Sequence, residues 1–290
     1  MVDVLLILDG ASDGPDPARP ASLATADMPH LAALAHEGEV TRLATVPPGL
    51  EPGSESAIPG LLGHTPTAPV DRAAIEAAAH GIPADEAWRV DVRTADGARA
   101  DILATARAAA RLRCAGHTVH HLRGHRLLVV GPTAPSAGDE LVVWPRGTAL
   151  PRVLDARTLV VGARGAATGI ATLLGADVLV PASATGDVDT NLEDKLAVAC
   201  RAIDGGRRDR VVVHVGGADE AAHRRDRAAK VAFLERVDAQ LIGPLADAVA
   251  AVRGTLRICP DHGCDPATGR HDAEPVPHVR WSAAPAAVPA

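Results

Sequence analysis

Six side chains of metal-binding type recur beside segments that have the pattern of buried strands. They are three aspartates and three histidines: Asp9, Asp219, His223, Asp261, His262 and His271. Functional groups of a parallel sheet gather at the carboxyl ends of its strands, so we expect these side chains to meet at one edge. Each of them alone is a weak signal. Together, three carboxylates and three imidazoles favour two divalent ions, and manganese or zinc fits better than calcium.

A pair of ions would suit a displacement at phosphorus, because two metals about 4 Å apart stabilise both the attacking and the leaving oxygen. The Pro/Gly/Ser-rich stretch 45–68 offers the nucleophile. There Ser54 follows Gly53, which permits close backbone approach, and a helix opening just afterwards would present amide groups to an oxyanion. From spacing alone Ser56 is nearly as good a candidate, and both serines could instead cap a helix.

Apolar strands and helices alternate around these residues. The expected strands are 2–8, 159–161, 178–180, 211–215 and 255–259, and the expected helices are 28–37, 166–174, 191–202 and 228–252. This alternation predicts an α/β fold with a mostly parallel sheet flanked by helices. The Ala/Pro-rich tail after Trp281 is expected to fray.

Residues 71–150 interrupt that alternation. An Ala-rich helix is expected near 98–114, and a hairpin is expected from strands 117–122 and 125–130. We interpret this segment as a small α+β insert, or cap. The core would then consist of residues 1–70 and 151–290.

The composition argues against two classes of partner. The net charge is −7, and the chain contains one Phe, three Trp and no Tyr, so neither a basic nucleic-acid surface nor a base-stacking platform is expected. No apolar run approaches the roughly 20 residues of a membrane span. The first residues lack the basic region of a secretory signal, which favours a cytoplasmic location.

The cysteines carry little information about function. Four are present, Cys114, Cys200, Cys259 and Cys264, and their spacing fits no zinc-ribbon pattern. We expect reduced, structural thiols. A metal role stays open for Cys259 and Cys264, because they flank Asp261 and His262.

Collinear segments along nearly the whole chain form a more specific pattern than any single motif. They include Leu8-Asp9-Gly10, Pro47-Pro-Gly-Leu-Glu-Pro-Gly-Ser-Glu-Ser-Ala, Ala184-Thr-Gly-Asp-Val-Asp-Thr-Asn, His214-Val-Gly-Gly-Ala-Asp-Glu-Ala-Ala-His, and Asp261-His through His271-Asp-Ala-Glu-Pro-Val-Pro. Together they resemble the archaeal-type, cofactor-independent phosphoglycerate mutases of the alkaline phosphatase superfamily. The resemblance implies an alkaline-phosphatase-like core and a cap that closes over a small phosphorylated acid.

The resemblance also implies roles for individual residues. Ser54 would be phosphorylated during turnover, and two divalent ions, Mn2+ or Zn2+, would be bound. One ion would be held by Asp9, Ser54, Asp261 and His262, and the other by Asp219, His223 and His271. Substrate contacts are implied for Arg89, Arg126, Asp189, Asn191 and Lys195.

Three departures from the family pattern affect the expected outcome of the reaction. The cap is much shorter than usual, Ile58 replaces a polar residue, and Ala222 replaces a glycine. A short cap excludes water less well, and water would release phosphate from a phosphoserine. The alternatives are therefore a phosphoglycerate mutase or close relative, a metal-dependent phosphohydrolase acting on a small phosphate or phosphonate ester, and a non-catalytic metal-binding regulatory protein. Competent residues at all seven ligand positions count against the last.

Overall fold

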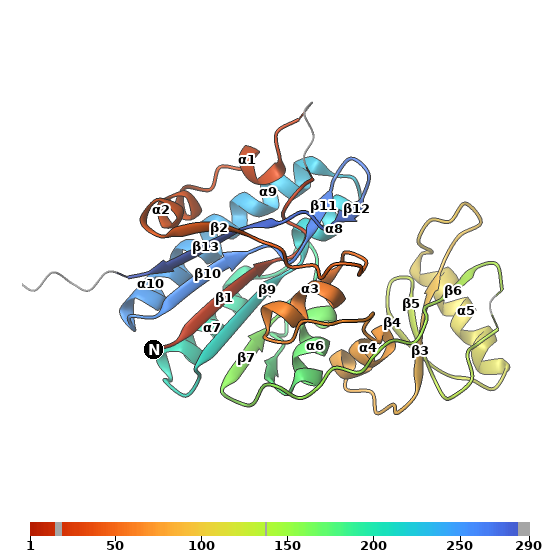
Figure 1. Cartoon of the computed structure of the whole chain (residues 1–290). Coiled ribbons are helices and arrows are strands. Elements are labelled where there is room, and N and C mark those ends of the chain that lie inside the picture. Colours follow the sequence, from red (N-terminus) through yellow and green to blue (C-terminus); the bar gives the residue numbers. More distant parts are fainter. Residues whose placement is uncertain (15–18, 137, 284–290) are drawn as a thin grey trace, which may run out of the picture. The chain divides into compact units, whose positions relative to one another are not determined.

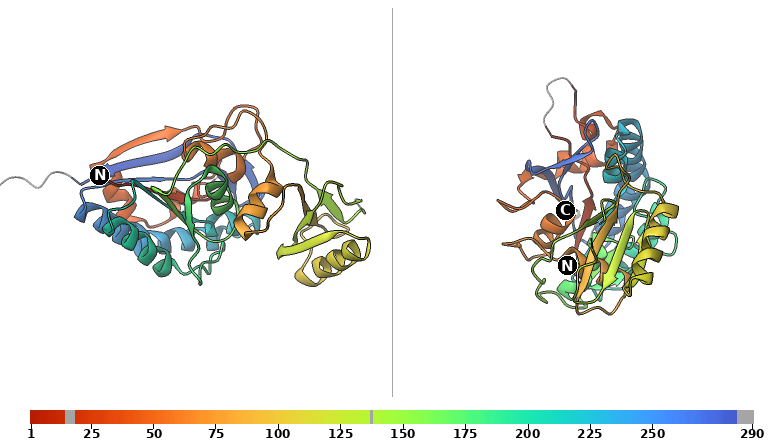
Figure 2. Two further views of the ribbon diagram at one scale, coloured as in Figure 1. Left: turned by 90° about the horizontal axis from the view of Figure 1, so that it is seen from below. Right: turned by 90° about the vertical axis from the view of Figure 1, so that its right-hand side faces the viewer.

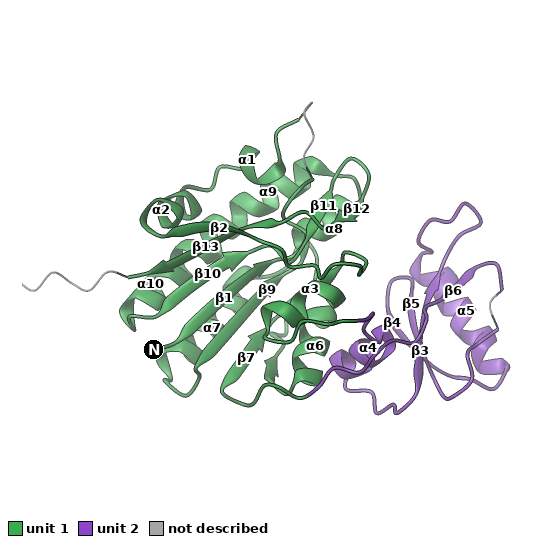
Figure 3. Cartoon of the chain, in the orientation of Figure 1, with its two compact units in different colours: residues 1–67, 152–290 green, residues 68–151 purple. Residues whose placement is uncertain are grey.

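The computed structural model describes residues 1–14, 19–136 and 138–283. The chain divides into two compact units (Figure 3): residues 1–67 with 152–290 form the core unit, and residues 68–151 form the insert unit. Most of the tail that was expected to fray, residues 284–290, lies outside the described residues.

The core unit is built on a seven-stranded sheet with the order β2-β13-β10-β1-β9-β7-β8 (Figure 1). Its parallel strands are β1 (Asp3–Leu8), β7 (Thr158–Val161), β8 (Asp177–Leu179), β9 (Arg210–Val215) and β10 (Thr255–Cys259). Val4 to Ile7 of the central strand β1 are fully buried, as expected for a parallel strand covered on both faces. The expectation of an α/β fold with a mostly parallel sheet is confirmed.

One edge of this sheet is antiparallel and was not predicted. β13 (Val276–Ser282) pairs with β10, and β2 (Glu39–Leu43) pairs with β13, both in the antiparallel sense. Pro277 lies within β13, and a proline inside an apolar run argues against a strand. All five residues of β2 are exposed, so this strand lacks the alternation of buried and exposed positions that marks a half-buried strand.

Helices cover both faces of the sheet (Figure 2). On one face, side chains from four helices join the inward residues of β1 in a single apolar cluster: α2 (Pro29–Glu37), α7 (Leu192–Asp204), α9 (Arg227–Val237) and α10 (Gly243–Ala251). On the other, α3 (Ser54–Leu61) lies beside α6 (Ala166–Leu174). The core unit also contains two short helices, α1 (Ser22–Thr25) and α8 (Gly217–His223).

The long helix expected over 228–252 is present as one continuous helical run from Arg227 to Ala251. Between α9 and α10 the chain forms a π-helical segment, Asp238–Ile242. Pro244 follows at the start of α10 and has no N–H to offer the carbonyl four residues earlier, which accounts for the wider turn. The buried Asp238 at this segment accepts hydrogen bonds from the backbone N–H groups of His30 and Leu31 at the start of α2.

The insert unit has the expected α+β composition. Its antiparallel sheet has the order β4-β5-β3-β6, formed by β3 (Ala87–Val92), β4 (Thr118–Arg123), β5 (Arg126–Val130) and β6 (Leu141–Val143). Two helices accompany it, α4 (Arg72–His80) and α5 (Ile102–Cys114). α5 begins four residues later than expected because the carboxylate of Asp101 accepts a hydrogen bond from the N–H of Ala104 and caps the helix there. Within the described residues, every helix is too short or too polar to span a bilayer.

Candidate metal centre

The carboxyl ends of three adjacent strands bring the acidic residues together. Asp9 follows β1, Asp261 follows β10, and Asp219 lies in α8 directly after β9. Gly10 permits this convergence. It has a φ of +60°, its N–H donates to Asp261 Oδ1 at 3.1 Å, and a Cβ there would lie only 2.6 Å from Asp219 Oδ1. A side chain at position 10 would therefore be strained and would also displace Asp219.

The first ligand group consists of Asp9, Ser54, Asp261 and His262. His262 Nε2 lies 3.4 Å from Asp9 Oδ1 and 3.5 Å from Asp261 Oδ2. Ser54 Oγ lies 3.4 Å from both Asp9 Oδ1 and His262 Nε2. Asp261 and His262 are fully buried. The four donor atoms thus surround one small volume at the end of β1.

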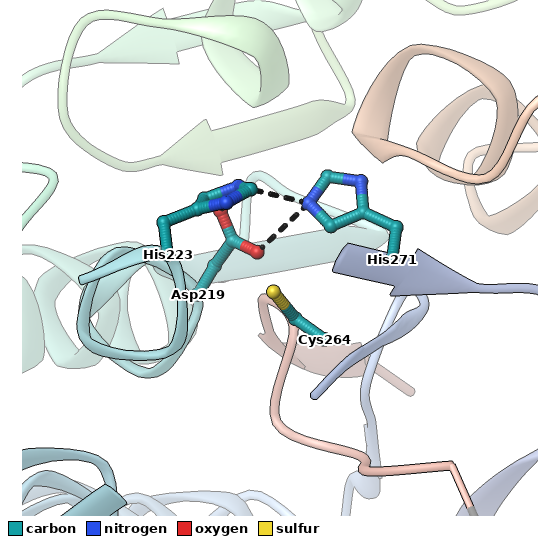
Figure 4. A group of neighbouring side chains, drawn as sticks. All are labelled: Asp219, His223, Cys264 and His271. Carbon is teal, nitrogen blue, oxygen red and sulfur yellow. Dashed lines mark hydrogen bonds and ion pairs between the residues drawn. The ribbon is translucent and has the colours of Figure 1, made fainter. Parts of the chain in front are cut away.

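The second ligand group consists of Asp219, His223 and His271 (Figure 4). His271 Nε2 lies 3.1 Å from Asp219 Oδ1 and 3.0 Å from His223 Nε2, and His223 Nε2 lies 3.3 Å from Asp219 Oδ2. Asp219 and His223 come from the same face of α8, whereas His271 comes from β12 (Arg270–Asp272). The structure therefore divides the six aspartates and histidines between two groups.

The imidazole orientations suit metal binding. In each of the three histidines Nδ1 faces a backbone carbonyl: His223 faces Gly269 O at 2.9 Å, His271 faces Pro52 O at 3.0 Å, and His262 faces Gly263 O at 3.1 Å. A carbonyl only accepts, so Nδ1–H of each ring donates to it, and Nε2 is left facing the ligand group. The Nε2 atoms of His223 and His271 lie 3.0 Å apart, so a cation or a proton must lie between them.

The electrostatics of the buried carboxylates also favour cation binding. Burial raises the pKa of Asp9 well above its usual value, and the charges of Asp261 and Asp219 add to the rise. Asp261 Oδ2 is buried without a hydrogen-bond partner in the described part of the chain. Burial also opposes ionisation of Asp219, but hydrogen bonds from His223 and His271 outweigh it and lower the pKa of Asp219 well below the usual value. Divalent cations would neutralise this set of charges.

Ser54 and Ser56 have different surroundings. Ser54 is the first residue of α3, where the positive end of the helix favours an anion, and its hydroxyl faces Asp9 and His262. Ser56 is buried, and its Oγ donates to the carbonyls of Glu51 (2.7 Å) and Gly53 (2.9 Å) within its own loop. Stretch 45–68, expected to be irregular, therefore contains the helix that positions Ser54.

The substrate contacts expected in the core unit make local hydrogen bonds. Asp189 accepts from the hydroxyl of Thr185 at 2.5 Å, and Asn191 caps α7 by accepting from the N–H of Asp194 at 3.0 Å. Lys195 is fully buried, and its Nζ donates to the carbonyl of His214 at 3.1 Å. Burial lowers the pKa of Lys195 to about 8.

The two expected arginine contacts lie in the insert unit. Arg89 is only 5% exposed and donates to Glu76 and to Asp91, each at 2.5 Å. Burial lowers the pKa of Arg89, and these two carboxylates counteract that shift. The side chain of Arg126 is 31% exposed, and its guanidinium lies 3.9 Å from Glu76. Of the two, Arg126 is the more accessible.

Two residues at the centre were not assigned from the sequence. His214, in β9, is buried with Nε2 3.2 Å from Asp9 Oδ2, and burial lowers its pKa to about 4, so its ring is neutral at pH 7. Cys264, in β11 (Gly263–Asp265), lies beside the second ligand group. His214 sits inside an apolar strand and gave no separate signal. For Cys264, the one sequence signal was its closeness to Asp261 and His262.

A family model decides the affiliation of the chain: the model of the Metalloenzyme superfamily matches residues 1–286. The chain belongs to the Metalloenzyme superfamily. Among curated relatives, the 2,3-bisphosphoglycerate-independent phosphoglycerate mutase of Methanopyrus kandleri is 26% identical over 370 aligned positions, which cover 97% of this chain and 87% of the relative. The 2,3-bisphosphoglycerate-independent phosphoglycerate mutase 1 of Archaeoglobus fulgidus is 28% identical, and the alignment covers 95% of this chain and 88% of the relative.

Solved structures support the fold of this Metalloenzyme superfamily member. The PH0037 protein from Pyrococcus horikoshii superposes with a TM-score of 0.81 at 21% identity, covering 97% of this chain and 87% of that one. The cofactor-independent phosphoglycerate mutase of Thermoplasma acidophilum gives a TM-score of 0.59 at 18% identity, and the match covers 97% of this chain and 90% of that one. At these identities the likeness shows a shared fold.

Proposed function

We propose that this chain is a metal-dependent phosphotransferase that interconverts 2-phosphoglycerate and 3-phosphoglycerate through a phosphorylated Ser54. The observation that carries the proposal is the position of the Ser54 hydroxyl, 3.4 Å from donor atoms of both Asp9 and His262 at the start of α3. Relatives named phosphoglycerate mutase, matched over 95–97% of the chain, supply the substrate class. A phosphotransfer nucleophile needs this combination of an activating centre and nearby anion-binding amides.

The donor sets indicate how the centre would work. The first ligand group would hold one divalent ion, Mn2+ or Zn2+, and the second ligand group another. When bound, the ions offset the negative charge of the phosphoryl group and lower the pKa of a coordinated hydroxyl. Ser54 Oγ would lose its proton and attack phosphorus, the bond from phosphorus to the glycerate oxygen would break, and that oxygen would take up a proton to become a hydroxyl. The first turn of α3 would bind a phosphoryl oxygen. The histidine Nδ1–H bonds to backbone carbonyls would keep each Nε2 aimed at its ion.

A mutase must also retain glycerate while phosphate sits on the serine. We assign this role to the insert unit, as a cap that excludes water. Arg126 would contact the substrate anion, and Arg89, held by Glu76 and Asp91, would position the cap strands beside it. Asp189, Asn191 and Lys195 would line the substrate side of the core unit. We place the reaction in glycolysis, in the cytoplasm, without a nucleic-acid or membrane partner.

The experiment is incubation of manganese- or zinc-loaded protein with 3-phosphoglycerate, followed by phosphorus NMR. Appearance of the 2-isomer without free phosphate supports the mutase. Absence of any phosphorus product, together with no phosphate on Ser54 in a fully metallated sample, would overturn the proposal in favour of a non-catalytic metal-binding protein.

A second candidate, a phosphohydrolase acting on a small phosphate or phosphonate ester, is favoured by the length of the chain. The alignment with the Methanopyrus kandleri enzyme has 370 positions, whereas this chain has 290 residues, so at least 80 positions have no residue here. Loss of covering segments would admit water to the phosphoserine. Release of inorganic phosphate as the main product in the same experiment would select this candidate.

A further inference from the structure

Cys264 faces the second ligand group from a fully buried position (Figure 4). Its Sγ and the donor atoms of Asp219, His223 and His271 all lie within 4.8 Å of one another. The separations among the other three range from 3.0 to 3.3 Å. Donors on one tetrahedral zinc ion would be about 3.3 Å apart, given zinc–nitrogen and zinc–oxygen bonds of about 2.0–2.1 Å. The three nitrogen and oxygen atoms are therefore spaced as ligands of a single ion, and the sulfur lies within 4.8 Å of each of them.

The position of the thiol is fixed by the fold. Cys264 pairs directly with His271 across the antiparallel ladder of β11 and β12, so both side chains project from the same face of the hairpin. Its N–H donates to Ser12 O at 2.8 Å, and its carbonyl accepts from the buried Lys230 Nζ at 2.7 Å. Hydrogen bonds on both sides thus hold the sulfur beside the imidazole of His271.

The two ligand groups differ in chemical softness. The first contains carboxylates, a hydroxyl and one imidazole, which are donors that Mn2+ accepts readily. The second contains one carboxylate and two imidazoles, and Cys264 would add a thiolate. Thiolate ligands favour Zn2+ over Mn2+. One protein can thus present two positions with different metal preferences.

We propose that Cys264 is a fourth protein ligand of the second ligand group and makes that position selective for zinc. On binding, the S–H bond breaks, the proton leaves to solvent, and a sulfur–metal bond forms without change of oxidation state. The inference rests on the metal centre of the proposed function but not on the reaction that the centre performs. It deepens that function by separating a zinc position from one that takes manganese.

Cobalt(II) substitution tests the proposal. Protein loaded with two equivalents of Co2+ is expected to show a near-ultraviolet sulfur-to-cobalt charge-transfer band. The Cys264→Ser variant should lose this band but keep visible d–d absorption, and its zinc affinity should fall by at least ~10-fold, as for lesser perturbations of metal sites. Cys259→Ser, which alters another buried cysteine outside the ligand groups, is the matched control and should retain the band.

Zinc X-ray absorption on the unmodified protein gives a second readout that needs no variant. A zinc–sulfur shell at about 2.3 Å is expected. Two bound cobalt ions without a charge-transfer band, or zinc without a sulfur shell, would overturn the role of Cys264 and leave the metal centre intact. Failure to bind any divalent ion would overturn the metal centre itself and this inference with it.

Discussion

The core and insert units both bury carboxylates, but they compensate the charge in different ways. In the insert unit, Glu76 and Asp91 face the guanidinium of Arg89 at 2.5 Å, so the chain supplies its own cation. At the edge of the core sheet, Asp9, Asp219 and Asp261 face imidazoles whose Nε2 atoms are turned toward them. The first arrangement is complete within the protein. The second would be completed by added metal ions. This difference distinguishes a structural ion cluster from a candidate metal centre.

The largest effect is expected from Ser54→Ala, which removes the proposed nucleophile and leaves Asp9, Asp261 and His262 in place. Turnover of 3-phosphoglycerate should fall by more than ~10³-fold, because losing a nucleophile removes the covalent route altogether. Quenching the reaction with labelled substrate measures phosphate on the protein, which should disappear. Ser56→Ala is the matched control and should still be labelled. Labelling that survives Ser54→Ala and vanishes in Ser56→Ala would reverse the assignment.

In the insert unit, Arg89→Met should destabilise the fold rather than the chemistry. It leaves Glu76 and Asp91 buried without the guanidinium that bonds to both of them, a change that costs about 3–5 kcal/mol. Two of the three tryptophans, Trp88 and Trp144, lie in this unit, so urea unfolding followed by fluorescence in a Trp281→Phe background reports on it. The loss of unfolding free energy should be the same with and without divalent ions. A loss that added metal reverses would contradict the self-contained ion cluster.

At the candidate metal centre, Asp261→Asn should change stability in opposite directions with and without metal. In chelated protein the variant should unfold at a higher temperature, because Asp261 Oδ2 is an unpartnered buried oxygen and its charge opposes that of Asp9. With ions at a hundredfold their dissociation constant, the free energy of unfolding of the normal protein should rise by about 2.7 kcal/mol per site. The variant should lack this stabilisation at one site. Metal analysis should show one ion fewer per chain. Asp247→Asn, at an exposed carboxylate of α10, is the control and should change neither quantity.

The sequence predicted those parts of the molecule that have a local signal. The apolar run of β1 and the helix Ala166–Leu174 lie where they were expected, and the parallel sheet followed from them. Asp9 and Asp261 could be placed at one edge because each directly follows a predicted strand. Cys264 could not, because its contact with His271 depends on the pairing of two three-residue strands that have no periodic pattern. The closed arrangement of Arg89 with Glu76 and Asp91 likewise depends on a helix packing on a strand, which spacing does not reveal.

The smallest expected effect concerns the protonation of His125, and it tests whether Arg89 is the cation that binds Glu76 and Asp91 in the insert unit. His125 Nε2 lies 3.8 Å from Asp91 Oδ1, but burial lowers the pKa of His125 to about 4 despite that carboxylate. Since the unfolded chain takes up this proton near pH 6.5, the contribution of His125 to stability is fully present above that pH and is lost as pH falls toward 4. Histidine NMR, with the resonance assigned by its absence in His125→Asn, should show a neutral ring down to about pH 4. An imidazolium already present at pH 6 would make His125 a further cation of the cluster, and the Arg89→Met variant would then lose less stability at pH 6 than at pH 8.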